Sequence, residues 1–223
     1  MSTLEVDGVF CISLVERKDR RQMLLEEFAP LGLDIEFYLA ERDSEDPERG
    51  CYESHQACAA MAIERGYERV LILEDDATLL NFKHEVIRRA NSFLKLKQPE
   101  ILYLGGMLGR MWLIPFPNIV RARLTGTHAY ILSRQGCKNL VRKKFSGTPI
   151  DTHYCNVVKS YSVYPMLSAQ QPEDEVKSDI VENRVKRKGG GSVKDKRYWD
   201  NNFSKQPSAL KRDIWRTLCM RWL

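Results

Sequence analysis

Three consecutive carboxylates follow a short apolar run near the middle of the chain. Glu74, Asp75 and Asp76 come directly after RVLIL at residues 69–73, a run that predicts a buried strand. Neighbouring negative charges repel one another and are costly to remove from water. A divalent cation would offset this charge, and Mg²⁺ and Mn²⁺ bind carboxylate oxygens together with substrate phosphates. The triplet therefore predicts a metal-assisted site for a phosphorylated ligand; capping of the following segment by Asp75 or Asp76 is the alternative.

Apolar runs and helical patterns alternate around this triplet. The runs that predict strands are residues 9–14, 35–39, 69–73, 101–106, 129–133 and 161–165. Helical spacing is found between them, at residues 20–31, 53–65 and 82–93, and again from Ser133 onward. Strands without polar alternation that are separated by helices predict an α/β fold, with a mostly parallel sheet covered on both faces. In such a sheet ligands bind beyond the carboxyl ends of the strands, where the triplet lies.

Two stretches between these elements predict loops. AERDSEDPERG at residues 40–50 carries the turn residues of an irregular connection. MWLIPFPNIVRAR at residues 111–123 is apolar but interrupted by prolines. We expect this second stretch either to pack over the sheet or to contact a ligand through the aromatic rings of Trp112 and Phe116.

The composition indicates a globular protein without a membrane span. Of the 223 residues 43% are hydrophobic, which is enough to fill a core, and no apolar run approaches the roughly 18 residues that a transmembrane helix needs. No leader pattern is visible at the N-terminus. The six cysteines are scattered and form no CxxC pair, so we expect reduced thiols and a cytoplasmic location.

The basic excess is confined to the last part of the chain. Residues 173–223 carry 13 basic and 8 acidic side chains, which equals the net charge of +5 for the whole chain. We expect a folded domain over residues 1–172, a basic and partly disordered or mobile segment over 173–207, and an amphipathic helix over 208–223. This helix carries Leu210, Ile214, Leu218 and Trp222 at steps of four. Three roles are open for it: packing on the domain, peripheral contact with an anionic membrane, or contact with a second copy in a homodimer.

Four segments together resemble the successive motifs of glycosyltransferase family 25. They are CISLVERKDRR at residues 11–21, GCYESHQACAAMAIERGYERVLILEDDA at 50–77, GTHAYILSRQGCKNL at 126–140 and PIDTHY at 149–154. That family includes bacterial lipooligosaccharide galactosyltransferases and collagen hydroxylysine glycosyltransferases. The resemblance implies a GT-A type, Rossmann-like fold, a UDP-sugar donor such as UDP-galactose or UDP-glucose, Mn²⁺ or Mg²⁺ as cofactor, and inverting transfer to a hydroxyl of a glycan or protein acceptor.

The resemblance also assigns roles to the acidic residues. Glu74 and Asp76 are expected to bind the metal, and Asp75 to contact the donor. His128 and His153 are open between completing the metal sphere and a structural role.

An inverting transfer needs a base for the acceptor hydroxyl, and Asp151 in PIDTHY is the candidate. Asp151 is equally suited by sequence to be the N-cap of the helix that follows, so this alternative stays open.

Donor contacts are expected from residues that follow the predicted strands or belong to the matching motifs. Arg17 and Arg20 suit bidentate contact with a diphosphate, with a solvated helix end as the alternative. His55 is open between a hydrogen bond to the donor and a structural role. Residues 104–109, LGGMLG, lack a dinucleotide fingerprint, so Gly105 is expected to let the backbone approach the sugar or to form a turn. The expected donor-binding residues are Leu14, Arg17, Arg20, His55, Asp75 and Gly105.

Two other classes of function compete with this interpretation. A metal-dependent nucleotidyltransferase or phosphotransferase would also use clustered carboxylates, but it would consume nucleoside triphosphates. A non-catalytic binding module could use the basic tail to attract nucleic acid. The tail lacks aromatic residues where it is most basic, so no nucleic-acid partner is expected.

Overall fold

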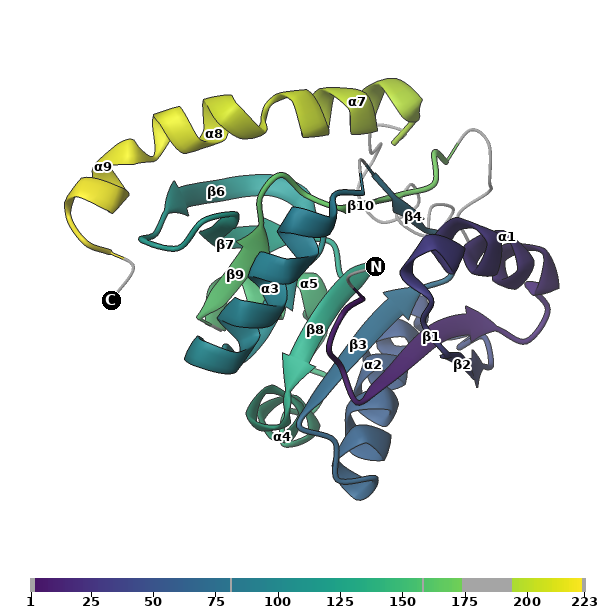
Figure 1. Ribbon diagram of the computed structural model, residues 1–223. Coiled ribbons are helices and arrows are strands. Elements are labelled where there is room, and N and C mark those ends of the chain that lie inside the picture. Colours follow the sequence, from purple (N-terminus) through teal and green to yellow (C-terminus); the bar gives the residue numbers. More distant parts are fainter. Residues whose placement is uncertain (1–2, 81, 158, 174–193, 222–223) are drawn as a thin grey trace.

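An eight-stranded sheet forms the centre of the computed structural model, which describes residues 3–80, 82–157, 159–173 and 194–221 (Figure 1). In spatial order the strands are β2 (Ile35–Ala40), β1 (Gly8–Leu14), β3 (Arg69–Glu74), β8 (Ala129–Ser133), β5 (Ile101–Tyr103), β9 (Ser160–Val163), β7 (Ile119–Thr125) and β6 (Met107–Leu113). Within this sheet β8 and β7 run against the direction of the other strands. Six of the eight strands therefore run in the same direction, as predicted for a mostly parallel sheet, although four of the seven neighbouring pairs are antiparallel.

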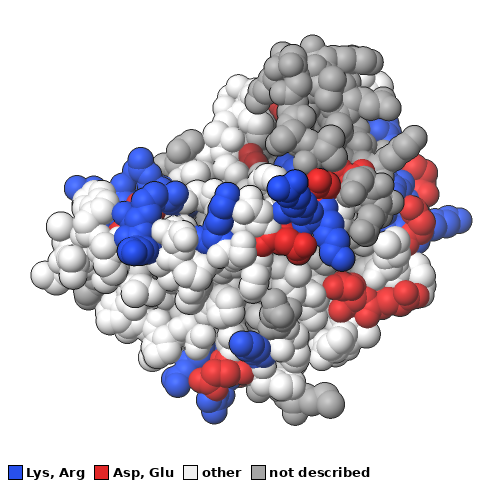
Figure 2. Space-filling view, turned by 90° about the horizontal axis from the view of Figure 1, so that it is seen from above, with Lys and Arg blue, Asp and Glu red and all other residues white. Residues whose placement is uncertain are grey.

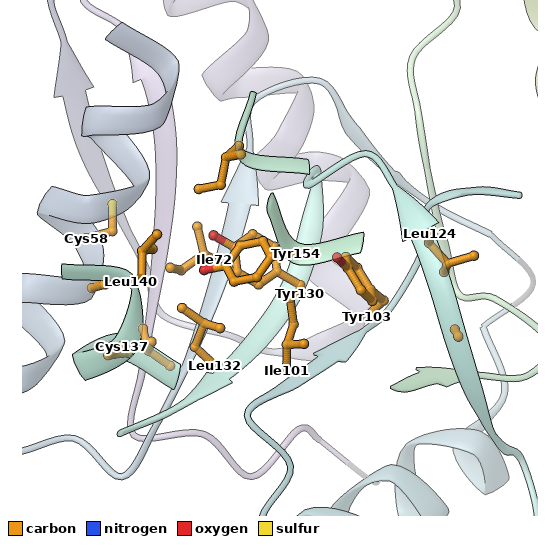
Figure 3. Close-up of a cluster of buried hydrophobic side chains, with 14 of the residues drawn as sticks. Cys58, Ile72, Ile101, Tyr103, Leu124, Tyr130, Leu132, Cys137, Leu140 and Tyr154 are labelled. Carbon is orange, nitrogen blue, oxygen red and sulfur yellow. The ribbon is translucent and has the colours of Figure 1, made fainter. Parts of the chain in front are cut away.

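Helices cover both faces of the sheet. α1 (Lys18–Phe28), the short 3-10 helix η1 (Ala29–Leu31) and α3 (His84–Lys97) pack on one face through side chains such as Leu24 and Phe93. α2 (Pro47–Glu64), α4 (Arg134–Val141) and α5 (Ile150–Val157) pack on the other. Figure 3 shows part of this second core, where Tyr130 and Tyr154 lie with their ring centroids 5.5 Å apart. The predicted α/β fold class is confirmed.

β3 positions the acidic triplet. Val70 and Ile72 belong to one core and Leu71 and Leu73 to the other, and all four are fully buried. Successive side chains of a strand point to opposite faces, so a strand covered on both faces reads as a continuous apolar run. The triplet begins at the last residue of β3. It is followed by a two-stranded antiparallel ribbon of β4 (Ala77–Leu79) and β10 (Ser168–Gln170).

The interpretation of residues 40–50 as a loop was wrong at its C-terminal end. α2 begins at Pro47, six residues before the predicted start. Asp46 is its N-cap and accepts a hydrogen bond from the backbone N of Glu48 at 3.1 Å, while the fixed φ of Pro47 suits the first helical position. These start signals are readable in the sequence, and the longer helix brings residues 47–52 to the carboxyl ends of the strands.

The loop expected at residues 111–123 is instead part of a β-hairpin, and the strand expected at 101–106 ends early. β5 stops at Tyr103, and β6 and β7 pair in antiparallel fashion. The buried side chains of β7 include Val120, Ala122 and Leu124, with arginines between them, which is the period of a half-buried strand. The prolines lie in the connection between β6 and β7, where they remove no ladder hydrogen bond.

The C-terminal residues form three short helices, of which the second and third lie along β6. They are α7 (Lys196–Ser204), α8 (Gln206–Arg212) and α9 (Ile214–Leu218) (Figure 1). Residues 174–193, within the segment predicted to be partly disordered or mobile, and 222–223 lie outside the described residues. Helical structure thus begins before residue 208 and is interrupted at Asp213. The proposed division into domains stays a prediction.

The C-terminal helices do not bury the apolar stripe that the sequence suggested. Leu210 is buried, but Ile214 and Leu218 are exposed. Arg216 is buried instead, with its guanidinium carbon 5.2 Å from the centre of the Trp112 ring and its Nε donating to Asp213 at 3.2 Å. The arginine thus packs on the aromatic ring through a cation–π contact.

The surface over these helices is basic, as Figure 2 shows from above. Peripheral membrane contact and a homodimer stay predictions. Within the described ranges no helix combines the length and apolar character needed to cross a bilayer.

None of the six cysteines is in a disulfide bond.

The N-cap of α2 gives a stability prediction. Asp46→Ala removes the acceptor for the Glu48 amide and should lower the free energy of unfolding by about 1 kcal/mol. Asp46→Asn keeps a side-chain oxygen and should lose much less. Urea denaturation followed by circular dichroism measures both. Equal losses for the two variants would contradict the assignment of Asp46 as a cap.

Candidate active site

The acidic triplet lies between two pockets. The β1-side pocket is lined by residues at the ends of β1 and β2, in α1 and in the first half of α2, among them Leu14, Arg20, Ala40 and Ser54. The α5-side pocket is lined by residues from β6, α5, β10 and α7, among them Met107, Asp151, Gln170 and Trp199. Three residues line both pockets: Cys51, Glu74 and Asp76. The carboxylates are thus shared by two adjoining cavities.

Asp75 forms a buried ion pair with Arg20 of α1. Asp75 Oδ1 accepts from Arg20 Nη1 at 3.0 Å, and less than a tenth of either side chain is exposed. Arg20 Nη1 also lies 3.8 Å from Asp76 Oδ2. Burial raises the pKa of Asp75, and the charge of Arg20 acts in the opposite direction. Because Arg20 is held by the triplet, its first role in the structure is to compensate the charge of these carboxylates; its predicted contact with the donor stays a prediction.

Glu74 is held by side chains from two other parts of the chain, Thr127 in the loop before β8 and His55 on α2. Its Oε1 accepts from Thr127 Oγ1 at 2.8 Å and lies 3.4 Å from Nε2 of His55. The His55 ring is fully buried, and its Nδ1 lies 2.8 Å from the hydroxyl of Tyr130. Burial raises the pKa of Glu74, but His55 and Thr127 outweigh this and hold the pKa below its usual value. His55 therefore contacts Glu74 and Tyr130 from a buried position.

Asp76 carries the least compensated charge of the triplet. Its two oxygens accept long hydrogen bonds from Gln170 Nε2, at 3.3 and 3.4 Å. Burial and the charges of Glu74 and Asp75 raise the pKa of Asp76 to about 7, although Arg20 acts in the opposite direction. A carboxylate that binds a proton this readily is one that a cation would stabilise. The oxygens of Asp76 are of the kind that a hard divalent cation prefers, and binding of such an ion by Asp76 and Glu74 stays a prediction.

Asp151 lies in the first turn of α5 and faces the α5-side pocket. Its Oδ1 accepts from the backbone N of Thr152 at 2.6 Å, and its Oδ2 accepts from the backbone N of Gly126 at 3.3 Å. α5 begins at Ile150, so Asp151 is inside the helix rather than at the N-cap position. The structure thus brings Asp151 to the same pocket as Glu74 and Asp76.

Of the other predicted donor-binding residues, Leu14 lines a pocket, whereas Arg17 and Gly105 make contacts within the protein. Leu14, the last residue of β1, lines the β1-side pocket. Arg17 forms an ion pair with Asp19 at 3.1 Å beside the start of α1. At Gly105 a Cβ atom would lie 1.8 Å from the backbone O of Ser168 and 2.8 Å from His128 Nε2. Gly105 is therefore required where two backbone segments pack closely; its contact with a sugar stays a prediction.

The two remaining histidines differ in burial. His128 is fully buried and packs edge-on against Trp199, with ring centroids 5.7 Å apart. Burial lowers the pKa of His128 to about 4, so the ring is neutral at physiological pH. His153 is partly buried on α5, and burial lowers its pKa as well.

Several residues of the site were not anticipated from the sequence. Thr127 and Tyr130 bind Glu74 and His55, and both belong to the GTHAY motif. Cys51 precedes His55 by four residues, a spacing that places both on one helix face. Trp199 belongs to the segment predicted to be partly disordered or mobile, and no local signal pointed to it.

Comparisons of the sequence with known proteins agree with the motif resemblance. Residues 40–125 match the family model described as "Glycosyltransferase family 25 (LPS biosynthesis protein)". A "Glycosyltransferase 25 family member" of Aedes aegypti is 26% identical in an alignment of length 172 that covers 62% of this chain and 28% of that protein. One of Drosophila melanogaster is 27% identical in an alignment of length 176 that covers 64% of this chain and 29% of that protein. The chain thus spans less than a third of the length of these curated relatives.

Comparisons of structure find more distant similarities. Protein A197 from STIV is 13% identical with a TM-score of 0.49, and the match covers 73% of this chain and 82% of that one. A glycosyltransferase involved in the glycosylation of the major capsid of PBCV-1 is 12% identical with a TM-score of 0.37, and the match covers 60% and 62%.

The fold and the clustered carboxylates define a class: an α/β protein with a candidate ligand site at the carboxyl ends of its central strands. The four motifs, the family model over residues 40–125 and the relatives all show that the chain is similar to glycosyltransferase family 25.

The Arg20–Asp75 pair gives a second stability prediction. Arg20→Met leaves Asp75 buried without its counter-charge and should lower the free energy of unfolding by about 3–5 kcal/mol at pH 7. Arg89→Met breaks an exposed ion pair with Glu85 and is the matched control, with an expected loss of about 0.5 kcal/mol. Urea denaturation measures both, and similar small losses would show that Arg20 is not required for folding.

The buried ring of His128 predicts a dependence of stability on pH. The folded pKa of about 4 lies below the unfolded value of about 6.5, so the unfolded state takes up the proton first as the pH falls. The contribution of neutral His128 is complete above pH 6.5 and is lost towards pH 4, by about 3 kcal/mol. His128→Leu should flatten the plot of unfolding free energy against pH in this window, measured by urea denaturation. His84→Gln, at the exposed start of α3, is the control; a wild-type slope in His128→Leu would contradict the prediction.

Proposed function

We propose that the chain is a metal-dependent, inverting glycosyltransferase that moves a hexose from a UDP-sugar, UDP-galactose or UDP-glucose, to an acceptor hydroxyl. One observation carries this proposal. The acidic triplet lies between two adjoining pockets, and a further carboxylate, Asp151, also lines the second of them. A transfer between two substrates requires two binding spaces that meet where the bond is exchanged. The similarity of residues 40–125 to the model of family 25 supports the same reaction class.

The β1-side pocket is the proposed site of the nucleoside diphosphate. It opens at the ends of the parallel strands β1 and β2, where ligands of such sheets bind. Leu14 and Ala40 supply apolar surface for a base or ribose, and Asp75 and Arg20 lie at its inner end. Arg17, His55 and Gly105 already make contacts within the protein. To contact the donor as well, each residue would have to change these contacts or make an additional one.

Asp76 and Glu74 are the proposed ligands of a Mn²⁺ or Mg²⁺ ion. Such an ion, when bound, supplies Lewis-acid stabilisation of the negative charge on the departing diphosphate. The residues of the chain contribute orientation. Thr127 and His55 hold Glu74, and Gln170 touches both oxygens of Asp76. Arg20 limits the repulsion between Asp75 and Asp76.

Asp151 is the proposed general base. The acceptor hydroxyl oxygen attacks the anomeric carbon while the bond from that carbon to the UDP oxygen breaks, and the hydroxyl proton passes to a carboxylate oxygen of Asp151. The amides of Thr152 and Gly126 hold its two oxygens and fix their direction. The acceptor is a lipooligosaccharide glycan or a collagen-like hydroxylysine. Trp199 in the pocket wall suits either, since an aromatic ring can stack on a sugar or cover an aliphatic chain.

A panel of UDP-sugars, each incubated with and without Mn²⁺ and scored for UDP release, tests this function. Asp76→Asn should lower metal-dependent turnover about 100-fold or more. Asp151→Asn should lower turnover by a similar factor while leaving the affinity for UDP and Mn²⁺ unchanged, because Asp151 lies on the acceptor side. Binding of UDP by calorimetry separates the two effects. A fully active, Mn²⁺-dependent Asp76→Asn protein would refute the metal assignment.

The competing functions give different results in the same assays. Consumption of nucleoside triphosphates without use of any UDP-hexose would identify a nucleotidyltransferase or phosphotransferase. Salt-sensitive binding of nucleic acid without sugar-nucleotide chemistry would identify a binding module.

A further inference from the structure

We propose that Cys51, His55 and Glu74 form a site for a thiophilic divalent cation of the Zn²⁺ class. One ligand atom from each residue, the Cys51 sulfur, a His55 ring nitrogen and a Glu74 carboxylate oxygen, lies within 4.8 Å of the other two. This set differs in chemistry from the oxygen ligands proposed for Mn²⁺ or Mg²⁺. Thiolate and imidazole favour Zn²⁺, whereas Mn²⁺ and Mg²⁺ favour carboxylates and water.

Local structure brings the three groups together. Cys51 and His55 are four residues apart on α2, so they lie about one helical turn apart on the same face of the helix. Glu74 is the last residue of β3 and meets that face from the sheet. His55 Nε2 lies 3.4 Å from Glu74 Oε1, longer than a usual N–H···O hydrogen bond. Nitrogen and oxygen ligands of a tetrahedral zinc ion are about 3.3 Å apart, given bond lengths of about 2.0–2.1 Å.

The surrounding groups are those that support a metal ligand. The hydroxyl of Tyr130 lies 2.8 Å from His55 Nδ1 and can accept its proton in a hydrogen bond, which leaves the Nε2 lone pair directed at the cluster. Nε2 itself is fully buried and makes no hydrogen bond of usual geometry among the described residues, although Glu74 Oε1 lies 3.4 Å away. Thr127 Oγ1 donates to Glu74 and fixes the carboxylate. All three ligand residues line the β1-side pocket, so an ion has a path to the site.

Glu74 connects this site with the proposed reaction. A Zn²⁺ ion bound to Glu74 would withdraw a ligand from the Mn²⁺ or Mg²⁺ ion, so Zn²⁺ should oppose turnover. This consequence rests on the proposed function. Binding of the thiophilic ion itself does not, and it is measured without substrate.

Titration of the full 223-residue chain with Co²⁺, a spectroscopic substitute for Zn²⁺, tests the site. The wild-type protein should give a thiolate-to-cobalt charge-transfer band that Zn²⁺ abolishes and excess Mg²⁺ does not. Cys51→Ser should lose the band and weaken Zn²⁺ binding about tenfold or more, measured by competition with a chelating dye. Cys219→Ser, which alters an exposed cysteine outside the cluster, is the matched control and should keep both properties.

A second variant tests the site independently, in case Cys51→Ser does not fold. Glu74→Gln should keep the thiolate band but weaken Zn²⁺ binding, and the far-ultraviolet circular dichroism of every variant is compared with wild type. The absence of a band in the wild-type protein, or its persistence in Cys51→Ser, would overturn the proposal and leave His55 as a residue that positions Glu74. Turnover with UDP-sugar and Mn²⁺ is assayed separately. Turnover without a cobalt band overturns this site alone, and a cobalt band without turnover overturns the proposed function alone.

Discussion

The concentration of negative charge at the end of β3 is the constraint on which the rest of the site depends. Three carboxylates lie at the end of this buried strand, and each has different partners. Asp75 pairs with Arg20, and Glu74 contacts Thr127 and His55. Asp76 has mainly a long hydrogen bond from Gln170. The partners come from α1, α2, β10 and the loop before β8. Elements far apart in sequence are therefore held together by the need to compensate one short stretch of charge.

Unequal compensation gives the carboxylates different properties. Asp75 is tied to a permanent cation, which offsets part of its charge inside the protein. Asp76 retains a high proton affinity at the border of both pockets. Burial and neighbouring charges differ over these few residues. Asp75 therefore has a structural role, whereas the carboxylate of Asp76 is available to a ligand.

Much of the fold could be predicted from the sequence because the relevant signals are local. The run before Glu74 predicted β3, and the alternation of strands and helices predicted an α/β sheet with the triplet at a strand end. The hairpin of β6 and β7 was missed because the prolines outweighed the period-two pattern of β7. The Arg20–Asp75 pair joins residues 55 positions apart, and Trp199 enters the pocket from beyond residues 174–193. Such contacts depend on tertiary packing, which local patterns do not report.

Trp199 in the wall of the α5-side pocket has a consequence for how such a protein can diversify. The family model covers residues 40–125, which hold the carboxylates, whereas this wall residue comes from the C-terminal helices. Substitutions in those helices can therefore reshape one side of a cavity while the charged centre stays intact. Under the proposed function, substitutions in the C-terminal helices could change which acceptor binds while the acidic triplet, and with it the reaction, stays the same.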